Sequence, residues 1–218
     1  MKPAYISTAY LGPVQQYCKM FRFPAVYLET AENYQKQTYR NRCVIAGANG
    51  ALTLTIPVIK PDSPKCLTKD IRISDHGNWR HLHWNAIVSA YNMSAFFEYY
   101  ADDFAPFYNR KYHFLFDFNE ELRSLICSLL DIEPNILYTN EYLPVVENDF
   151  REAINPRHPK PDETFSPVTY YQVFKDKHGF LPNLSIVDLL FNMGPESAIV
   201  LKQSSLNRVS RILVGIGK

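Results

Sequence analysis

Short apolar runs and one helical repeat make up the first 30 residues of the chain. Residues 5–8 and 25–28, the latter reading AVYL, are apolar enough to predict two short strands. Between them, apolar side chains recur at spacings of three and four, at Val14, Tyr17, Cys18 and Phe21. This spacing predicts a helix, and the proline of Gly12-Pro13 suits its first turn. A strand, a helix and a strand in this order normally form a parallel pair.

The next apolar pattern is typical of a β-hairpin. Residues 42–46 and 52–58 flank the sequence GANG, and in the second arm apolar positions alternate with Thr53, Thr55 and Pro57. Alternation with a period of two gives a strand one apolar face. A short connection rich in glycine and asparagine fits a hairpin turn, which argues against a purely parallel sheet.

Two later segments change to the helical period. One apolar stripe runs from Trp79 to Tyr91, and a second covers residues 122–130 before Pro134 ends it. Residues 135–138, which read NILY, predict one late strand. Strands interleaved with helices predict an α/β fold with a mixed sheet, in which a parallel strand-helix-strand unit and a β-hairpin carry flanking helices. The 218 residues suffice for one core, so we expect a single domain over residues 1–218.

One long polar stretch breaks these patterns. Residues 147–167 have no apolar period and contain four prolines, at positions 156, 159, 161 and 167. We therefore expect an irregular excursion from the domain at about 147–167. Loops of this length either carry function or are disordered.

The charge of the chain is nearly balanced, with 23 lysines and arginines against 22 aspartates and glutamates. This balance gives no reason to expect nucleic acid as a partner. Residues 1–80 nevertheless hold 11 basic and 5 acidic side chains, a net +6, whereas residues 81–218 hold 12 and 17, a net −5. A modest positive field over the N-terminal part is expected.

Cysteine spacing and the absence of long apolar runs bear on the compartment. Cys18, Cys43, Cys66 and Cys127 show no C-x-x-C pair, so they are interpreted as free thiols in a reducing environment. The first 21 residues lack the apolar core of about 7–15 residues found in signal peptides. No run reaches the roughly 20 apolar residues needed to span a bilayer. We expect a cytoplasmic protein without a membrane span.

The stretch FLPNLSIVDLLFNMGPES, residues 180–197, is an apolar helix with three polar positions. Ser185, Asp188 and Asn192 are three and four residues apart, so they lie along one side of the helix. Local structure offers one interpretation, a capping box of Ser185 and Asp188 with a stop at Gly194-Pro195. Asn192 is not explained in this way. Short polar groups on an apolar helix otherwise indicate specific hydrogen bonds, inside the protein or to a ligand.

Two other clusters of polar residues offer candidate chemistry. The run NYQKQTYRNR, residues 33–42, places Lys36, Arg40 and Arg42 among amides and tyrosines, which suits a phosphate or a carboxylate but also a solvated basic loop. Histidines 81 and 83 point about 200° apart on a helix, so we expect no metal site there. His83 lies on the apolar stripe, either as a hydrogen-bonded core histidine or as a general acid or base facing a pocket.

The end of the first predicted strand is a weaker candidate. Free helix amides near Gly12 stand where an open α/β sheet often binds an anion. The chain has no G-x-G-x-x-G, no G-x-x-x-x-G-K-[ST] and no G-x-S-x-G sequence, so dinucleotide binding, P-loop chemistry and serine hydrolysis lack their motifs.

Four blocks of sequence, taken in order, point to a known family. They read YLGPVQQY, NRCVIAGANGALTLTIPV, WRHLH followed by AFF, and GFLPNLSIVDLLFNMGPE, and together they resemble the WbqC-like protein family over most of the chain. The family's pattern falls on Tyr10, Pro13, Tyr17, Asn41, Arg42, Trp79, His83, Gln172, Asn183, Ser185, Asp188, Asn192 and Gly194. After the late strand the chain reads YTNEYL where many members have a Y-L-S-G-type segment, so its ligand is expected to differ if that segment binds ligand.

The resemblance implies a function in bacterial surface polysaccharide synthesis, because members are often encoded among such genes. It implies a transferase acting on an activated sugar or a phosphorylated precursor, as in O-antigen synthesis, with glycyl transfer as one form. The expected partner is a phosphorylated or nucleotide-linked small molecule, and the sequence identifies no cofactor. Two alternatives stay open. The protein is a non-catalytic nucleotide- or sugar-binding module, or the polar seam is structural and the functional surface lies elsewhere.

In the transferase interpretation, Arg42 and Lys36 bind the anionic part of the substrate, and His83 or Asp188 transfers the proton. The other expected substrate-binding residues are Tyr10, Asn41, Gln172, Asn183, Ser185 and Asn192. This interpretation expects His83, Arg42 and the seam over residues 183–192 to line one cavity.

Overall fold

A small parallel sheet organises the N-terminal part of the protein. The computed structural model describes residues 1–61, 63 and 65–205. Strands β1 (Ala4–Ser7), β2 (Val26–Glu29) and β5 (Ile136–Tyr138) form a parallel sheet in the order β1-β2-β5, and helix α1 (Val14–Arg22) connects the first two. The predicted parallel strand-helix-strand unit is confirmed. The even positions of β1 and β2 are apolar and fully buried, which directs one face of the sheet into the core.

The predicted hairpin is also confirmed. Strands β3 (Arg42–Gly47) and β4 (Gly50–Thr55) pair antiparallel, with Arg42 opposite Thr55 and Gly47 opposite Gly50. The second arm is shorter than predicted and ends at Thr55, shortly before Pro57. Proline has no N–H to donate to a strand partner, and beyond it only an isolated bridge joins Val58 to Ile73.

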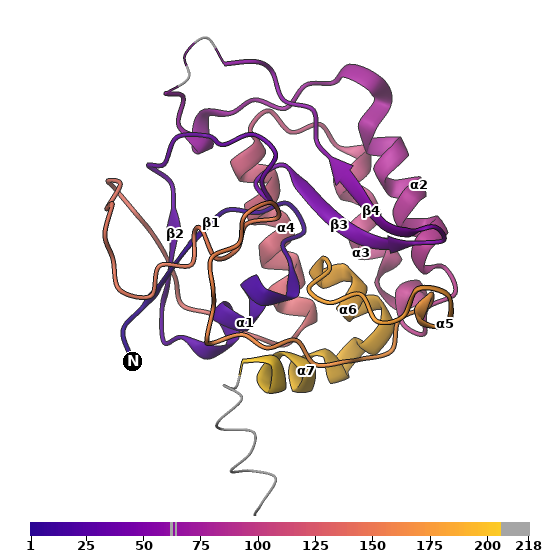
Figure 1. Ribbon diagram of the computed structural model, residues 1–218. Coiled ribbons are helices and arrows are strands. Elements are labelled where there is room, and N and C mark those ends of the chain that lie inside the picture. Colours follow the sequence, from indigo (N-terminus) through magenta and orange to yellow (C-terminus); the bar gives the residue numbers. More distant parts are fainter. Residues whose placement is uncertain (62, 64, 206–218) are drawn as a thin grey trace, which may run out of the picture.

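Helices pack against the hairpin on the side of β3, whereas β4 is largely exposed (Figure 1). Besides α1, three predicted helices are present as α2 (Trp79–Tyr91), α4 (Leu115–Leu129) and α6 (Ile186–Met193). Helix α6 lies between Ser185 and Gly194, as predicted. Helices α3 (Phe97–Asn109), α5 (Lys175–His178) and α7 (Ser197–Ser204) were not predicted. Single 3₁₀ turns occur at η1 (Thr68–Asp70), η2 (His76–Asn78) and η3 (Gly194–Glu196). The predicted α/β class, with a parallel strand-helix-strand unit, a β-hairpin and flanking helices, is therefore confirmed. The parallel strands and the hairpin form two sheets and are not joined in one mixed sheet.

Helix α6 lies at the centre of the core. Its residues from Ile186 to Phe191 are fully buried, and the ring of Phe191 packs edge-on against Tyr91, Phe97 and Phe104 of the neighbouring helices. Backbone bonds fix both ends of the helix, because Ile186 N–H donates to the Gly12 carbonyl and Phe96 N–H donates to the Phe191 carbonyl. The stretch that appeared apolar on every side is thus a core helix.

The segment over residues 139–174 contains no helix or strand but is held against the domain. Near Asp149 it runs beside β1, where Tyr5 N–H donates to the Asn148 carbonyl and Phe150 N–H donates to the Tyr5 carbonyl. Further along, Asp162 forms a buried ion pair of 2.5 Å with Lys19 of α1. The orange loop of Figure 1 therefore follows the domain surface through specific bonds. Within the described ranges, no helix is long and apolar enough to cross a bilayer.

Candidate functional site

His83 lies in an aromatic cluster beneath the hairpin. The Tyr10 hydroxyl is 3.0 Å from His83 Nδ1 and 2.9 Å from the Tyr108 hydroxyl. The imidazole stacks on Tyr10 and meets the edge of Trp79. Tyr10 belongs to the loop after β1, whereas the other residues come from α2 and α3, so the structure brings two sequence-predicted residues together across 73 positions.

The environment of His83 determines its protonation. Burial lowers the pKa of His83 to about 4, and a hydrogen bond with the backbone of Thr55 opposes this only in part. The ring is therefore neutral at neutral pH. A general base works best when its pKa is near the operating pH, so this imidazole is a weak base in the structure as it stands.

Asp188 is the centre of a second buried cluster. Its carboxylate accepts hydrogen bonds from Tyr91 at 2.8 Å, Tyr170 at 2.7 Å and Gln172 Nε2 at 2.8 Å. Burial raises the pKa of Asp188, and these three donors oppose that rise without cancelling it. The Gln172 amide also binds both backbone groups of Leu181, so the cluster joins α2, α6 and the segment before α5.

The capping-box interpretation of Ser185 and Asp188 is wrong. Ser185 precedes α6 but makes no side-chain cap, because its hydroxyl donates to the Leu11 carbonyl at 2.6 Å. The Asp188 side chain points to the tyrosines described above instead of back to the Ser185 amide. Tertiary partners therefore replace the local partners that the spacing suggested.

The remaining polar residues of this helix region bind backbone and side chains of the protein. Asn192 Nδ2 donates to the Asp188 carbonyl at 2.7 Å, while its Oδ1 is buried with no partner among the described residues. Asn183 Oδ1 accepts the Gln15 backbone N–H at 2.9 Å, and its Nδ2 donates to the Gln15 side chain.

These contacts correct the expectation of an anion site near Gly12. Asn183 occupies the Gln15 amide, and the Val14 and Gln16 amides donate to the carbonyls of Leu184 and Pro13. The backbone amides of Val14, Gln15 and Gln16 are thus already hydrogen-bonded within the protein and are not available to an anion.

The basic run divides into residues with different environments. Arg40 is buried and forms an ion pair with Glu32, whereas Lys36 is exposed. Arg42 is half-buried at the start of β3, on the opposite strand face from Cys43, the residue whose side chain points to the Tyr10 cluster. Arg42 therefore faces away from His83. Asn41 Nδ2 donates to the Ile56 carbonyl, and the Asn41 carbonyl accepts the Ile56 N–H. The Asn41 Oδ1 is buried and has no hydrogen-bond partner among the described residues.

The carboxyl ends of β1, β2 and β5 carry a charged network that sequence reasoning missed. Glu29, the last residue of β2, accepts from Arg151 at 2.9 Å and from Thr139, which follows β5. Arg151 also bonds Asp149, and three residues beyond β2 Glu32 binds Arg40 and Ser7. In open α/β sheets, ligands bind outside the carboxyl ends of the strands. The charges at this end identify it as a candidate site.

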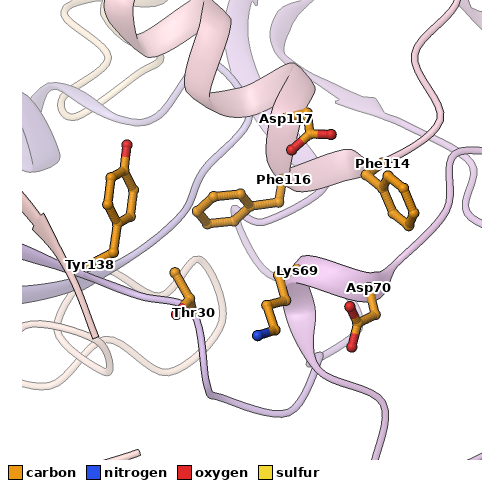
Figure 2. Close-up of a pocket in the computed structure, with 7 residues that line it drawn as sticks. All are labelled: Thr30, Lys69, Asp70, Phe114, Phe116, Asp117 and Tyr138. Atoms are coloured by element: carbon orange, nitrogen blue, oxygen red, sulfur yellow. The ribbon is translucent and has the colours of Figure 1, made fainter. Parts of the chain in front are cut away.

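Two pockets open on this end of the sheet. One of about 460 Å³ lies beyond β2 and β5, between η1 and the start of α4 (Figure 2). Its lining residues are Thr30, Lys69, Asp70, Phe114, Phe116, Asp117 and Tyr138. A second, of about 300 Å³, borders Glu32, Asn33, Asp149 and Arg151. A third, of about 420 Å³, lies on the other side of η1 and shares Asp70 with the first.

These three pockets do not contain the sequence-predicted site residues. His83, Asp188 and Arg42 line none of them. Tyr10 and His83 meet in one buried cluster, and Asp188 and Gln172 meet in another, whereas Arg42 points elsewhere. Within the described chain, no three His, Cys, Asp or Glu side chains are grouped to share a metal ion.

One sequence signal could have located the sheet end. The predicted strand AVYL runs into Glu29 and Thr30, and NILY ends at Tyr138 and is followed by Thr139. Polar residues directly after buried parallel strands meet at one edge of a sheet. Lys69 and Phe116 carry no comparable signal, because they approach this edge only through the packing of η1 and α4.

Comparison with known proteins gives two matches. The profile of the WbqC-like protein family matches residues 10–157. The uncharacterized protein Rv1507c of Mycobacterium tuberculosis is similar to this chain, with 26% identity over 194 residues, covering 78% of this chain and 84% of the relative. No solved structure matches the chain significantly.

Proposed function

Because the chain belongs to the WbqC-like protein family, we propose that it is a transferase of surface polysaccharide synthesis, acting on an activated sugar or a phosphorylated precursor. The observation that carries this proposal is the arrangement of pockets and charges at the carboxyl ends of the parallel strands. That edge is where the fold class generally places small-molecule ligands.

The proposed site is supported by preorganisation. Glu29, Arg151 and Asp149 are locked in mutual ion pairs beneath the smaller pocket, and Arg151 also lies over the Tyr142 ring at 4.7 Å. Side chains fixed in this way need little reordering when a ligand binds, which lowers the entropic cost of binding. The same edge holds Thr30 and Tyr138 at the larger pocket.

A second function is favoured by the state of the predicted proton carriers. His83 and Asp188 have their hydrogen-bonding groups directed to protein partners, and His83 is neutral with a pKa of about 4. A module that binds a nucleotide or sugar without transforming it needs a pocket but no titrating group beside its ligand. The same protein surface would serve this role.

A mass-spectrometric screen separates the two functions. The purified protein is incubated with nucleotide sugars, sugar phosphates and glycyl donors, and both bound ligand and product are measured. We expect at least one activated sugar to bind and to be converted. Binding without product would establish the binding module, and the absence of both from the whole panel would contradict the proposal.

Two variants test the predicted roles of the buried residues. If Arg42 binds the anionic group and His83 moves a proton, Arg42→Ala and His83→Ala proteins that remain folded lose ligand affinity or turnover. His83→Gln preserves a polar partner for Tyr10 and controls for loss of packing. Wild-type affinity and activity in all three proteins would exclude these roles.

A further inference from the structure

We propose that the 460 Å³ pocket beyond β2 and β5, here called the η1–α4 pocket, binds the pyranose ring of an uncharged sugar. This inference rests on the proposed function for the class of ligand. The lining itself combines flat aromatic surface with charged hydrogen-bonding groups, which is the chemistry that a pyranose requires on its C–H faces and its hydroxyls.

The aromatic part of the lining forms an angled wall. The ring of Phe116 projects from the first turn of α4 toward Tyr138, and their centroids are 6.1 Å apart at an interplanar angle of 64°. Figure 2 shows these two rings facing Thr30 and Lys69 across the hollow. Tyr138 is 48% exposed, so a large part of its ring is free to cover a ligand.

The polar part of the lining contains three charged side chains that are available to a ligand. Within the described part of the chain, Lys69, Asp70 and Asp117 form no ion pair. An ammonium donates hydrogen bonds and a carboxylate accepts them, whereas each sugar hydroxyl can do both. One cation and two carboxylates around a ring of hydroxyls therefore offer partners of both kinds.

Neighbouring residues hold the wall in place. The Tyr138 hydroxyl donates to Glu120 at 2.9 Å, and Glu120 is fixed by Arg123 at 2.9 Å. On the other side, the Thr30 N–H donates to the Thr139 hydroxyl at 3.0 Å, which joins the ends of β2 and β5. The pocket is thus built on strand ends and a helix terminus, which are rigid supports for a binding site.

The charge of the lining selects among possible ligands. Two carboxylates against one ammonium give a net charge of −1, so a phosphate placed among these groups is repelled. A nucleobase would suit the aromatic wall, but its attached phosphates would have to leave the pocket. An uncharged sugar ring satisfies both parts of the lining without that conflict, and the activating group of a donor would extend outside.

The test uses the whole protein and simple probes. A panel of methyl pyranosides, including methyl glucoside, methyl galactoside and methyl N-acetylglucosaminide, is titrated while binding is followed by NMR, with uridine and adenosine as competing probes. We expect saturable binding of at least one pyranoside in the millimolar range. Binding of no pyranoside in the panel, or preference for a nucleoside at the same pocket, would overturn the proposal.

Substitutions locate the binding. Phe116→Leu and Tyr138→Leu keep an apolar side chain but remove the ring, and Asp117→Asn keeps the side-chain size but removes the charge. Each is expected to raise the dissociation constant about tenfold. The matched controls are Tyr99→Leu and Asp102→Asn on α3, where both side chains are exposed and away from the pocket. Circular dichroism confirms folding. Wild-type affinity in all three pocket variants would place the sugar elsewhere.

The outcome is distinguishable from that of the proposed function. If activated donors are converted but the pocket variants keep wild-type KM and kcat, the transferase stands and the sugar site is wrong. If methyl pyranosides bind through Phe116 and Tyr138 but no donor is converted, the sugar site stands and the transferase is wrong.

Discussion

Single buried side chains set the pH response expected of this protein. Where an aspartate or histidine is surrounded by protein, its pKa reports the cost of charging it there. His83 and Asp188 both show this effect, but in opposite senses: burial lowers the pKa of His83 and raises that of Asp188. In both cases burial favours the neutral form of the side chain over the charged form.

His83 gives the clearest prediction at this scale. Its pKa is about 4 in the folded protein and 6.5 when unperturbed, so between these values the unfolded chain binds more protons. The stability that depends on neutral His83 is present above pH 6.5 and is lost as the pH falls toward 4. At about 1.4 kcal/mol for each pKa unit, the free energy of unfolding falls by roughly 3 kcal/mol across this window.

Urea unfolding at pH 7 and pH 4.5 measures this effect. His83→Gln removes the titrating group, so its free energy of unfolding should fall less than that of the wild type between the two values. His81→Gln, at an exposed histidine on the same helix, should keep the wild-type difference. An unchanged difference in the His83 variant would show that the ring is not held neutral by burial.

The junctions between elements depend on backbone conformation and on close contacts. Helix α6 ends at Gly194, whose φ of +50° lies in the left-handed region, and η3 and α7 follow directly. A Cβ at this position would lie 2.5 Å from the ring of Phe96. The Gly-Pro stop signal predicted from sequence therefore has a second, tertiary reason.

Gly194→Ala is expected to be strongly destabilising. The left-handed backbone costs a non-glycine residue about 1–2 kcal/mol, and the contact with Phe96 adds about 1–3 kcal/mol of overpacking. Gly77→Ala separates the two contributions, because Gly77 has a φ of +78° and no atom within 4 Å of its Cβ position. Thermal or urea unfolding should show the larger loss at Gly194. Equal losses would mean that Phe96 moves aside without cost.

At the scale of the whole molecule, a few buried ion pairs join distant segments into one body. Lys19 of α1 is fully buried against the Phe150 ring and contacts both Asp162 and Thr164 of the irregular segment. Burial raises the pKa of Asp162, but the charge of Lys19 and the hydrogen bonds from Lys19, Gln15 and Thr164 together outweigh it, so the pKa is lowered overall. The carboxylate is thus ionised and paired at neutral pH.

Breaking this pair should loosen the irregular segment. Asp162→Asn leaves the Lys19 charge buried without a counter-charge, which costs about 3 kcal/mol in comparable buried pairs. We expect lower stability and faster proteolysis within residues 147–167. Glu147→Gln, which breaks the exposed pair with Lys2 in the same segment, should change neither. Equal proteolysis of the two variants would show that the Lys19 pair does not anchor the segment.

Much of the fold could be predicted because it depends on local periodicity. The strand-helix-strand unit, the hairpin and α2 each repeat apolar residues at the spacing of their own structure, so their sequences contain the signal. Helix α3 was missed although its buried residues Phe97, Phe104 and Tyr108 follow the same rule. The C-terminal end of β4 at Thr55 could not be predicted from the sequence either, because it depends on which distant residues pair with residues 56–58.

The candidate site could be predicted only in part, for a reason that concerns polar residues. The sequence identified Tyr10, His83, Gln172 and Asp188 as special, and the structure does bring them together in pairs. It could not identify their partners, because a hydrogen bond between segments 73 or 97 residues apart has no local signature. Nor could it show that Arg42 faces away from His83.

The sequence by itself therefore determined the strand-helix-strand unit, the hairpin and the helices α2, α4 and α6, together with their apolar faces, since these follow from neighbours along the chain. Only the tertiary structure decided that the histidine and the aspartate are buried in separate clusters, and that two open pockets lie at the carboxyl end of the sheet. Those outcomes depend on how η1, α4 and the irregular segment pack against strands that are remote in sequence.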